Sequence, residues 1–316
     1  MQPGQARPRA VFFGSPEFAV PFLEVVAAGT ELRAVVSQPD RPAGRGKQLT
    51  EPPVKVAARR LGVPVLQPEK IRTPDFEAAL RAQDADLFVV VAYGRILPQP
   101  LLDIPRLGPW NVHASLLPRL RGAAPIQWAI IRGEPRTGVA VMRMEAGLDT
   151  GPVAAVAETA IGDDETAGQL FPRLARLGAD LLAATLPHIA AGTVTLRPQD
   201  DALATVAPLL KKEDGRLDFT QTARQVSARA RGVDPWPGAT ALLDGEVVKL
   251  FRPRVLEGAP GQPGRVLGVV AEGLAVGCAD RPIAFAELQL PGRKRLPSAA
   301  VVAGRPIAAG TALEPG

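Results

Sequence analysis

The 316-residue sequence is poor in the side chains that build disulfides and zinc sites: it has one cysteine, Cys278, and two histidines, His113 and His188. A single cysteine cannot form a disulfide within the chain, and these three residues are too few for a Cys/His zinc site. The sequence therefore excludes redox and structural-zinc functions, and we predict no metal. Cys278 is expected to be a small core residue.

Long apolar runs are also missing. No stretch approaches the length of a membrane span, and residues 1–9 are polar and Pro-rich, without the apolar segment of a signal peptide. We therefore expect a cytoplasmic protein with no membrane partner, whose first nine residues form a disordered tail.

The charge is unevenly distributed along the chain. The formal net charge is +5, and residues 205–316 hold 15 Lys and Arg against 11 Asp and Glu, so most of the surplus lies in that part. A basic region suggests a polyanionic partner such as a nucleic acid. An apolar fraction of 46% is ample for two domains with cores of their own.

The order of apolar patterns predicts two domains of different class. Short apolar runs alternate with helical patterns over 10–150, which is typical of an α/β fold with a parallel sheet. After about residue 190 the chain turns to short alternating strands bounded by Gly and Pro, which favour a smaller β-rich barrel or sandwich. We predict an α/β domain over 10–190, a linker over 191–207 and a basic β-barrel domain over 208–316. The predicted elements include strands at 10–14, 31–37, 86–94, 110–115 and 138–144, a long helix at 166–192, and later strands at 245–255, 264–271, 273–279 and 282–290.

The first strand is followed by a turn that lacks a phosphate-binding motif. The stretch "FFGSPEF" (12–18) contains only Gly14, so the G-x-G-x-x-G pattern of dinucleotide sites is absent, as is a Walker A loop. Binding of NAD is therefore disfavoured.

A polar pair lies in the alternating run "WNVHAS" (110–115), which comes after the apolar run at 86–94. Because side chains alternate along a strand, Asn111 and His113 are expected to share a face, and at the carboxyl edge of a parallel sheet that face opens into the ligand crevice. Asn can donate to a developing oxyanion and His can move a proton, which together suit attack on a carbonyl. Asp149, between Gly147 and Gly151, could orient the imidazole.

Spacing alone leaves other roles open for these residues. An Asp between glycines is often only a turn residue, and a His at a strand end is often structural. The "DTG" at 149–151 is also typical of aspartic proteases, but those need two such carboxylates on a β-rich scaffold, and here one copy follows an α/β pattern.

Several segments together resemble the methionyl-tRNA formyltransferase family over nearly the whole chain. They occur in the order that this family uses: "QPDRPAGRGK" (38–47), "NVHASLLP" (111–118), "RGAAPIQWAI" (121–130), "GLDTG" (147–151), "LLKKEDGRLDF" (209–219) and "DPWPGA" (234–239).

The resemblance implies a Rossmann-like formyltransferase domain followed by a basic barrel of oligonucleotide-binding (OB) type, and a reaction. The α-amine of methionyl initiator tRNA attacks the formyl carbon of 10-formyltetrahydrofolate, with Asn111 polarising the formyl oxygen, His113 transferring the proton and Asp149 orienting His113. We also expect the protein to be a monomer. The family's folate-contacting motif matches Ser115, Leu116, Leu117 and Pro118, and its basic loop for the acceptor stem matches Arg41, Arg45 and Lys47.

Three alternatives remain at this point. Phosphoribosylglycinamide formyltransferases share the Asn-x-His and distal Asp but resemble only the front domain. A sugar-nucleotide formyltransferase would need a different partner domain, commonly a second dinucleotide-binding one, and no such motif follows residue 205. A tRNA-binding protein with a degenerate catalytic half is disfavoured because all three catalytic side chains are present.

Overall fold

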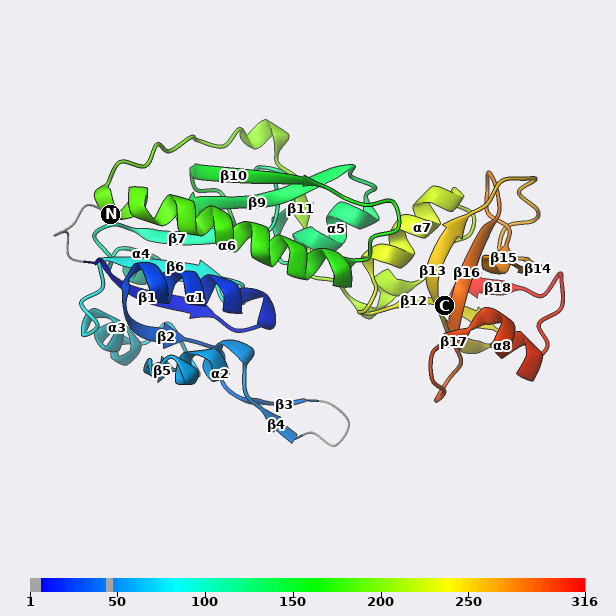
Figure 1. Cartoon of the computed structure of the whole chain (residues 1–316), viewed down its shortest axis with the longest axis horizontal. Helices are drawn as coiled ribbons and strands as arrows, with labels where there is room; N and C mark the ends of the chain where they lie inside the picture. Colours follow the sequence, from blue (N-terminus) through cyan, green and yellow to red (C-terminus); the bar gives the residue numbers. More distant parts are fainter. Residues whose placement is uncertain (1–6, 44–47, 316) are drawn as a thin grey trace. The chain divides into compact units, whose positions relative to one another are not determined.

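The computed structural model describes residues 7–43 and 48–315, drawn in colour in Figure 1. The chain forms two compact units. Of the predicted N-terminal tail, residues 1–6 lie outside the described residues, and Arg9 already belongs to the first strand. The predicted domain bounds stay a prediction. The first unit comprises Met1–Ala123, Gly138–Thr159 and Phe171–Ala207, and the second Ala124–Thr137, Ala160–Leu170 and Pro208–Gly316.

A seven-stranded sheet forms the centre of the first unit, in the order β10-β9-β7-β6-β1-β2-β5. The five strands from β7 to β5 pair in parallel, which confirms the predicted Rossmann-like sheet. The run at 86–94 supplies a fully buried central strand, as its continuous apolar character predicts. The strands are β1 (Arg9–Gly14), β2 (Glu31–Val36), β5 (Val65–Leu66), β6 (Leu87–Val91), β7 (Pro109–His113), β9 (Arg136–Arg143) and β10 (Val153–Ala160).

The far end of this sheet differs from the expectation of an all-parallel arrangement. Strand β9 runs antiparallel to β7, with His113 opposite Ala140, and β10 lies beyond it where no strand was predicted. An apolar run indicates a buried strand but carries no information on its direction, because both pairings bury the same side chains. The sheet is therefore mixed rather than wholly parallel.

Helices pack against both faces of the sheet. On one face, a Cβ at Gly178 of α6 would lie 2.7 Å from Phe22 of α1 and 2.9 Å from Val139 of β9, so these elements meet with no room for a larger residue. On the other face, Phe76 of α3 and Leu101 of α4 join the core of β1 and β6. The long helix predicted at 166–192 is confirmed as α6. The bounds are η1 (Glu17–Ala19), α1 (Val20–Gly29), α2 (Pro53–Arg60), α3 (Pro74–Arg81), α4 (Gln99–Leu102) and α6 (Ala167–Ala191).

Two small sheets accompany the large one. The hairpin of β3 (Arg41–Ala43) and β4 (Gln48–Thr50) occupies the polar stretch after β2, which was predicted as a loop. Strand β8 (Arg121–Gly122) pairs in parallel with β11 (Val206–Ala207). The end of the predicted 191–207 linker is thus paired with the segment that follows the Asn-x-His motif. The 3₁₀ turn η2 (Asp201–Leu203) lies within that stretch.

The second unit contains a mostly antiparallel sheet with the path β14-β15-β16-β13-β12-β18, and β17 pairs with β16. The four strands predicted after residue 245 are confirmed as β13 to β16. Closure into an OB-type barrel stays a prediction. The elements are α5 (Pro125–Ile131), η3 (Lys212–Gly215), α7 (Ala223–Gly232), β12 (Ala239–Leu243), β13 (Glu246–Val255), β14 (Val266–Val270), β15 (Gly273–Val276), β16 (Ile283–Gln289), β17 (Leu296–Pro297), α8 (Ser298–Gly304) and β18 (Leu313–Pro315).

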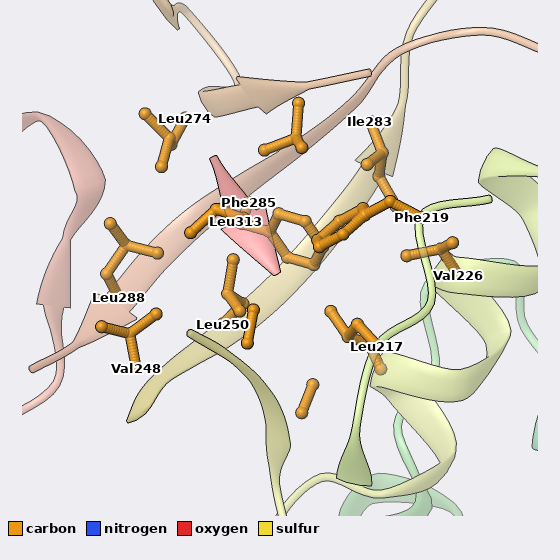
Figure 2. Packing of buried hydrophobic residues seen from close by; sticks show 14 of the residues in the cluster. Leu217, Phe219, Val226, Val248, Leu250, Leu274, Ile283, Phe285, Leu288 and Leu313 are labelled. Carbon is orange, nitrogen blue, oxygen red and sulfur yellow. The ribbon is translucent and has the colours of Figure 1, made fainter. Parts of the chain in front are cut away.

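This unit has a hydrophobic core of its own, shown in Figure 2. Phe285 of β16 packs edge-on against Phe219, with ring centroids 6.3 Å apart, and Val226 of α7 covers the same core. Cys278 is fully buried in it, as predicted, and burial raises the pKa of its thiol to about 12. The thiol is therefore protonated and unreactive at neutral pH. Among residues 7–43 and 48–315, no helix is both long and apolar enough to cross a bilayer.

Candidate active site

Strand β7 brings Asn111 and His113 to the carboxyl end of the parallel strands. They lie two positions apart in one strand, so their side chains project to the same face, while Trp110 and Val112 are buried on the other. His113 is the last residue of the strand and is only 6% exposed, whereas Asn111 is half-buried. The amide and the imidazole therefore share the surface that the strand pattern predicts.

Asp149 meets both of these side chains, although it follows them by more than 35 residues. Its Oδ1 accepts a hydrogen bond from Asn111 Nδ2 at 3.3 Å, and its Oδ2 lies 3.6 Å from His113 Nδ1. Oδ2 also accepts from the backbone N–H of Gly122 at 2.8 Å. The carboxylate is 8% exposed. The structure thus brings together the three side chains that the sequence singled out, and the carboxylate is fixed from two sides.

The hydrogen bonds of the imidazole decide which nitrogen can act as a base. His113 Nε2 lies 3.0 Å from the carbonyl oxygen of Leu120. A carbonyl oxygen only accepts, so Nε2 must carry the ring hydrogen, and Nδ1 is the nitrogen that can take up a proton. With a proton on Nδ1 the imidazolium would form an ion pair with Asp149, whose Oδ2 lies 3.6 Å away. This polarity is suited to removing a proton from a nucleophile and returning it to a leaving group.

The segment after β7 forms an apolar wall that follows His113 in the sequence. The hydroxyl of Ser115 donates to the carbonyl of Arg119 at 2.6 Å and is completely buried, so it shapes the loop instead of facing a ligand. Leu116, Leu117 and Pro118 are half-buried, and Leu117 packs against the cluster around Met142. A wall of this kind suits the flat aromatic face of a ligand.

Metal ligands are not part of this arrangement. Over residues 7–43 and 48–315, the described His, Cys, Asp and Glu side chains contain no group of three or more placed to hold a metal ion. The carboxylate of Asp149 is instead engaged by N–H donors.

Sequence reasoning missed the groups that hold the pair in place. They are the carbonyl of Leu120, the N–H of Gly122, the hydroxyl of Thr205, which accepts from Leu120 N at 2.9 Å, and the amide of Gln199. Every residue has a backbone carbonyl, and all but proline have an N–H, so the first two carry no signal in a sequence. Thr205 and Gln199 lie in the stretch predicted to be a linker.

Gly122 has a close approach that only glycine permits. Its φ is 122°, and a Cβ there would lie 2.6 Å from the carbonyl oxygen of Ala207. We expect Gly122→Ala to reduce the free energy of unfolding by about 2 to 4 kcal/mol, because it adds backbone strain to the clash. Urea titration measures this loss. The control is Gly192→Ala, at φ 67° with open space around it, where only about 1 kcal/mol is expected; equal losses in the two variants would show that the close contact is immaterial.

The basic hairpin carries the remaining predicted residues. Arg41 is exposed at the start of β3, whereas Arg45 and Lys47 lie outside the described residues. Lys55 Nζ lies 2.7 Å from Asp40 Oδ2 and 3.1 Å from Glu51 Oε1, the residues just before β3 and just after β4. Hydrogen bonds from Gln67 and Lys55 lower the pKa of Asp40. Lys55 therefore ties the two ends of the hairpin together and adds no free charge to it.

Comparison with known proteins shows which family the chain is similar to. A model described as "Formyl transferase" matches residues 9–186, and one described as "Formyl transferase, C-terminal domain" matches residues 209–306. A curated relative from Geobacter sulfurreducens, named "Methionyl-tRNA formyltransferase", is 51% identical over 306 residues, covering 96% of each chain. Another of the same name from Pelobacter propionicus is 52% identical over 304 residues, covering 96% of this chain and 95% of its own.

Solved structures show the same fold at lower identity. The sugar 3N-formyl transferase WlaRD, crystallised with dTDP and 5-N-formyl-THF, superposes with a TM-score of 0.68 at 15% identity, covering 92% of this chain and 100% of that one. HypX from Aquifex aeolicus in complex with tetrahydrofolic acid gives a TM-score of 0.61 at 19% identity over 94% of this chain, which spans 47% of the length of HypX. At these identities the likeness establishes the fold alone.

Proposed function

Because this chain belongs to the methionyl-tRNA formyltransferase family, it is a formyl-transferring enzyme that acts on methionyl-tRNA, and we propose that Asn111, His113 and Asp149 perform the transfer. The observation that carries the assignment is the contact of Asp149 with both partners, at 3.3 Å from Asn111 Nδ2 and 3.6 Å from His113 Nδ1. The direct test is formylation of charged initiator tRNA from a formyl-folate donor, compared with charged elongator tRNA.

The proposed role of His113 is to move one proton. In the reaction the amine nitrogen forms a bond to the formyl carbon, and the bond from that carbon to the donor nitrogen breaks. His113 Nδ1 takes the proton that the amine loses and returns it to the donor nitrogen as that nitrogen leaves. Asp149 stabilises the imidazolium between these steps, because its carboxylate lies beside Nδ1 and is kept there by the N–H of Gly122.

The proposed role of Asn111 is to stabilise the charge that develops on the formyl oxygen. Its amide has two N–H groups, and Asp149 Oδ1 accepts one of them at 3.3 Å. We assign the other to the formyl oxygen. Because the amide is already oriented by Asp149, this donor needs no rearrangement during the reaction, which is the condition for effective electrostatic stabilisation.

We propose 10-formyltetrahydrofolate as the donor, bound along Leu116, Leu117 and Pro118. Their half-buried apolar surface begins three residues after His113 in the chain and suits the flat ring of a folate. Ser115 supports this wall from inside, through its hydrogen bond to Arg119. The donor supplies the formyl group, and the residues of this chain supply orientation and proton transfer.

We propose that the hairpin with Arg41, Arg45 and Lys47 binds the acceptor stem of the tRNA. Arg45→Ala is expected to raise the KM for charged tRNA more than the KM for folate, since it removes a phosphate contact. Each lost contact should also lower the slope of log affinity against log salt by about 0.7 to 0.9. Steady-state kinetics with each substrate and a salt titration of tRNA binding measure the two effects.

A matched control for this prediction is Arg33→Ala, on β2. Arg33 is an exposed arginine and is paired with Glu31 at 2.6 Å. It should leave both KM values and the salt slope unchanged. Equal losses of tRNA and folate affinity in Arg45→Ala would instead mean that the loop serves the donor.

We further propose that the protein works as a monomer in the cytoplasm, where charged tRNA is available. A second candidate, formyl transfer to a small amine such as an amino-sugar nucleotide, is less supported, because the relatives from G. sulfurreducens and P. propionicus match this chain nearly end to end.

A further inference from the structure

A stretch of chain far from the catalytic residues in sequence runs alongside the Asp149 loop. Val153 and Arg197 form an antiparallel bridge, with N–H to carbonyl distances of 2.8 Å and 2.9 Å. In an antiparallel register the residue two positions after Arg197 lies opposite the residue two positions before Val153. Gln199 is therefore placed opposite Gly151, within reach of the backbone that carries Asp149.

The side-chain amide of Gln199 uses its whole hydrogen-bonding capacity there. Its Nε2 donates to the carbonyl of Asp149 at 2.8 Å and to that of Gly151 at 2.7 Å. Its Oε1 accepts from Arg121 Nε at 3.1 Å and Nη2 at 2.9 Å. An amide has two N–H donors and two acceptor lone pairs, and all four are satisfied. Arg121 can only donate, so it also fixes which end of the amide faces the loop.

Arg121, which donates to Gln199 Oε1, lies in the chain between the two residues whose backbone groups bind His113 and Asp149. Arg121 follows Leu120, whose carbonyl accepts from His113 Nε2, and precedes Gly122, whose N–H donates to Asp149 Oδ2. Gln199 thus connects the segment that orients the imidazole to the backbone of the residue that provides the carboxylate. Asp149 itself has φ 56°, a conformation that a non-glycine residue keeps only when its surroundings impose it.

We propose that Gln199 is a positioning residue for formyl transfer, which keeps Asp149 Oδ2 against His113 Nδ1 by tying the 149–151 loop to Arg121. This inference rests on the proposed function, because Gln199 acts through Asp149 and His113. Glutamine suits the position on chemical grounds. Glutamate would set a carboxylate against two carbonyl oxygens, and asparagine is one carbon too short to reach both sides.

The main test replaces the amide in two ways. Gln199→Glu keeps the size of the side chain and its pairing with Arg121, so the protein should fold. It loses both N–H donors to the 149–151 loop. Gln199→Ala removes the whole bridge. Both variants are expected to lower kcat about 10- to 100-fold, the scale for a catalytic group displaced by about 1 Å, with KM for charged tRNA and folate within about twofold of the unaltered protein.

Asp201→Ala is the matched control. Asp201 Oδ1 accepts from Arg121 Nη2 at 2.7 Å, with a side chain that is 81% exposed, so it engages the same guanidinium as Gln199 from the solvent side. Its removal should leave kcat unchanged. An equal loss of kcat in Asp201→Ala and Gln199→Glu would overturn the proposal, since it would trace the effect to Arg121 alone.

A double variant separates positioning from general structural support. If Gln199 acts through Asp149, adding Gln199→Ala to Asp149→Asn should lower kcat by less than twofold further, because the charge to be positioned is already gone. If the kcat losses of Gln199→Ala and Asp149→Asn multiply in the double variant, the proposal would be overturned. Unchanged kcat in Gln199→Glu, alongside inactive His113→Ala, would sink this inference alone, whereas full activity in His113→Ala would sink the proposed function itself.

Discussion

Replacing His113 with alanine is expected to lower kcat for formyl transfer by about 10²- to 10⁴-fold, the range for removal of a general acid–base group. The structure supplies the reason. Nε2 is engaged by the carbonyl of Leu120, so in the proposed mechanism Nδ1, which lies 3.6 Å from Asp149 Oδ2, is the nitrogen that exchanges a proton with the substrate. Single-turnover formylation of charged tRNA measures the effect.

The second histidine of the chain provides the control for this prediction. His188 is exposed near the end of α6, and its Nδ1 lies 3.5 Å from the hydroxyl of Thr193. His188→Ala should therefore retain full activity. A turnover for His113→Ala equal to that of His188→Ala would remove the imidazole from the mechanism.

An effect of the same size is expected for Asp149→Asn, with a fall in kcat of about 10²- to 10⁴-fold. The substitution keeps the shape of the side chain, and the asparagine oxygen can still accept from the N–H of Gly122. The negative charge beside His113 Nδ1 is lost, however, so the imidazolium is no longer stabilised. Kinetics and near-UV circular dichroism together show whether the loss is one of charge and not of fold.

Asp180→Asn, at an exposed position of α6, is the companion variant for Asp149→Asn. It removes the same charge from the same unit and should leave kcat unaltered. If Asp149→Asn also turned over normally, the carboxylate would be only a turn residue, which is the role that its two flanking glycines suggest on their own.

The α/β class could be predicted because burial leaves a clear pattern in the sequence. The run at 86–94 is apolar throughout and became the central strand β6, buried at every position. The same pattern could not give the direction of β9, which pairs antiparallel to β7. Strand β10 was missed because its residues, many of them alanine, alternate only weakly between buried and exposed.

Part of the candidate site could likewise be predicted from the sequence, and part of it could not. Strand alternation alone puts Asn111 and His113 on one face. The glycines on either side of Asp149 make it a candidate partner of the imidazole, and the resemblance to a family supports that role. The supporting groups could not be found in this way, because the carbonyl of Leu120 and the N–H of Gly122 belong to the backbone. Gln199 is 50 residues from Asp149 and lies in a polar stretch with no regular period.

The sequence by itself determined the class of fold, the family and the candidate catalytic side chains, because these depend on local periodicity and on which residues are present in which order. Only the tertiary structure decided which nitrogen of His113 is basic and what holds Asp149 beside it. Those properties depend on contacts between segments brought together by folding. The carbonyl of Leu120 binds His113 Nε2, and the N–H groups of Gly122 and of the Asn111 side chain bind the carboxylate of Asp149.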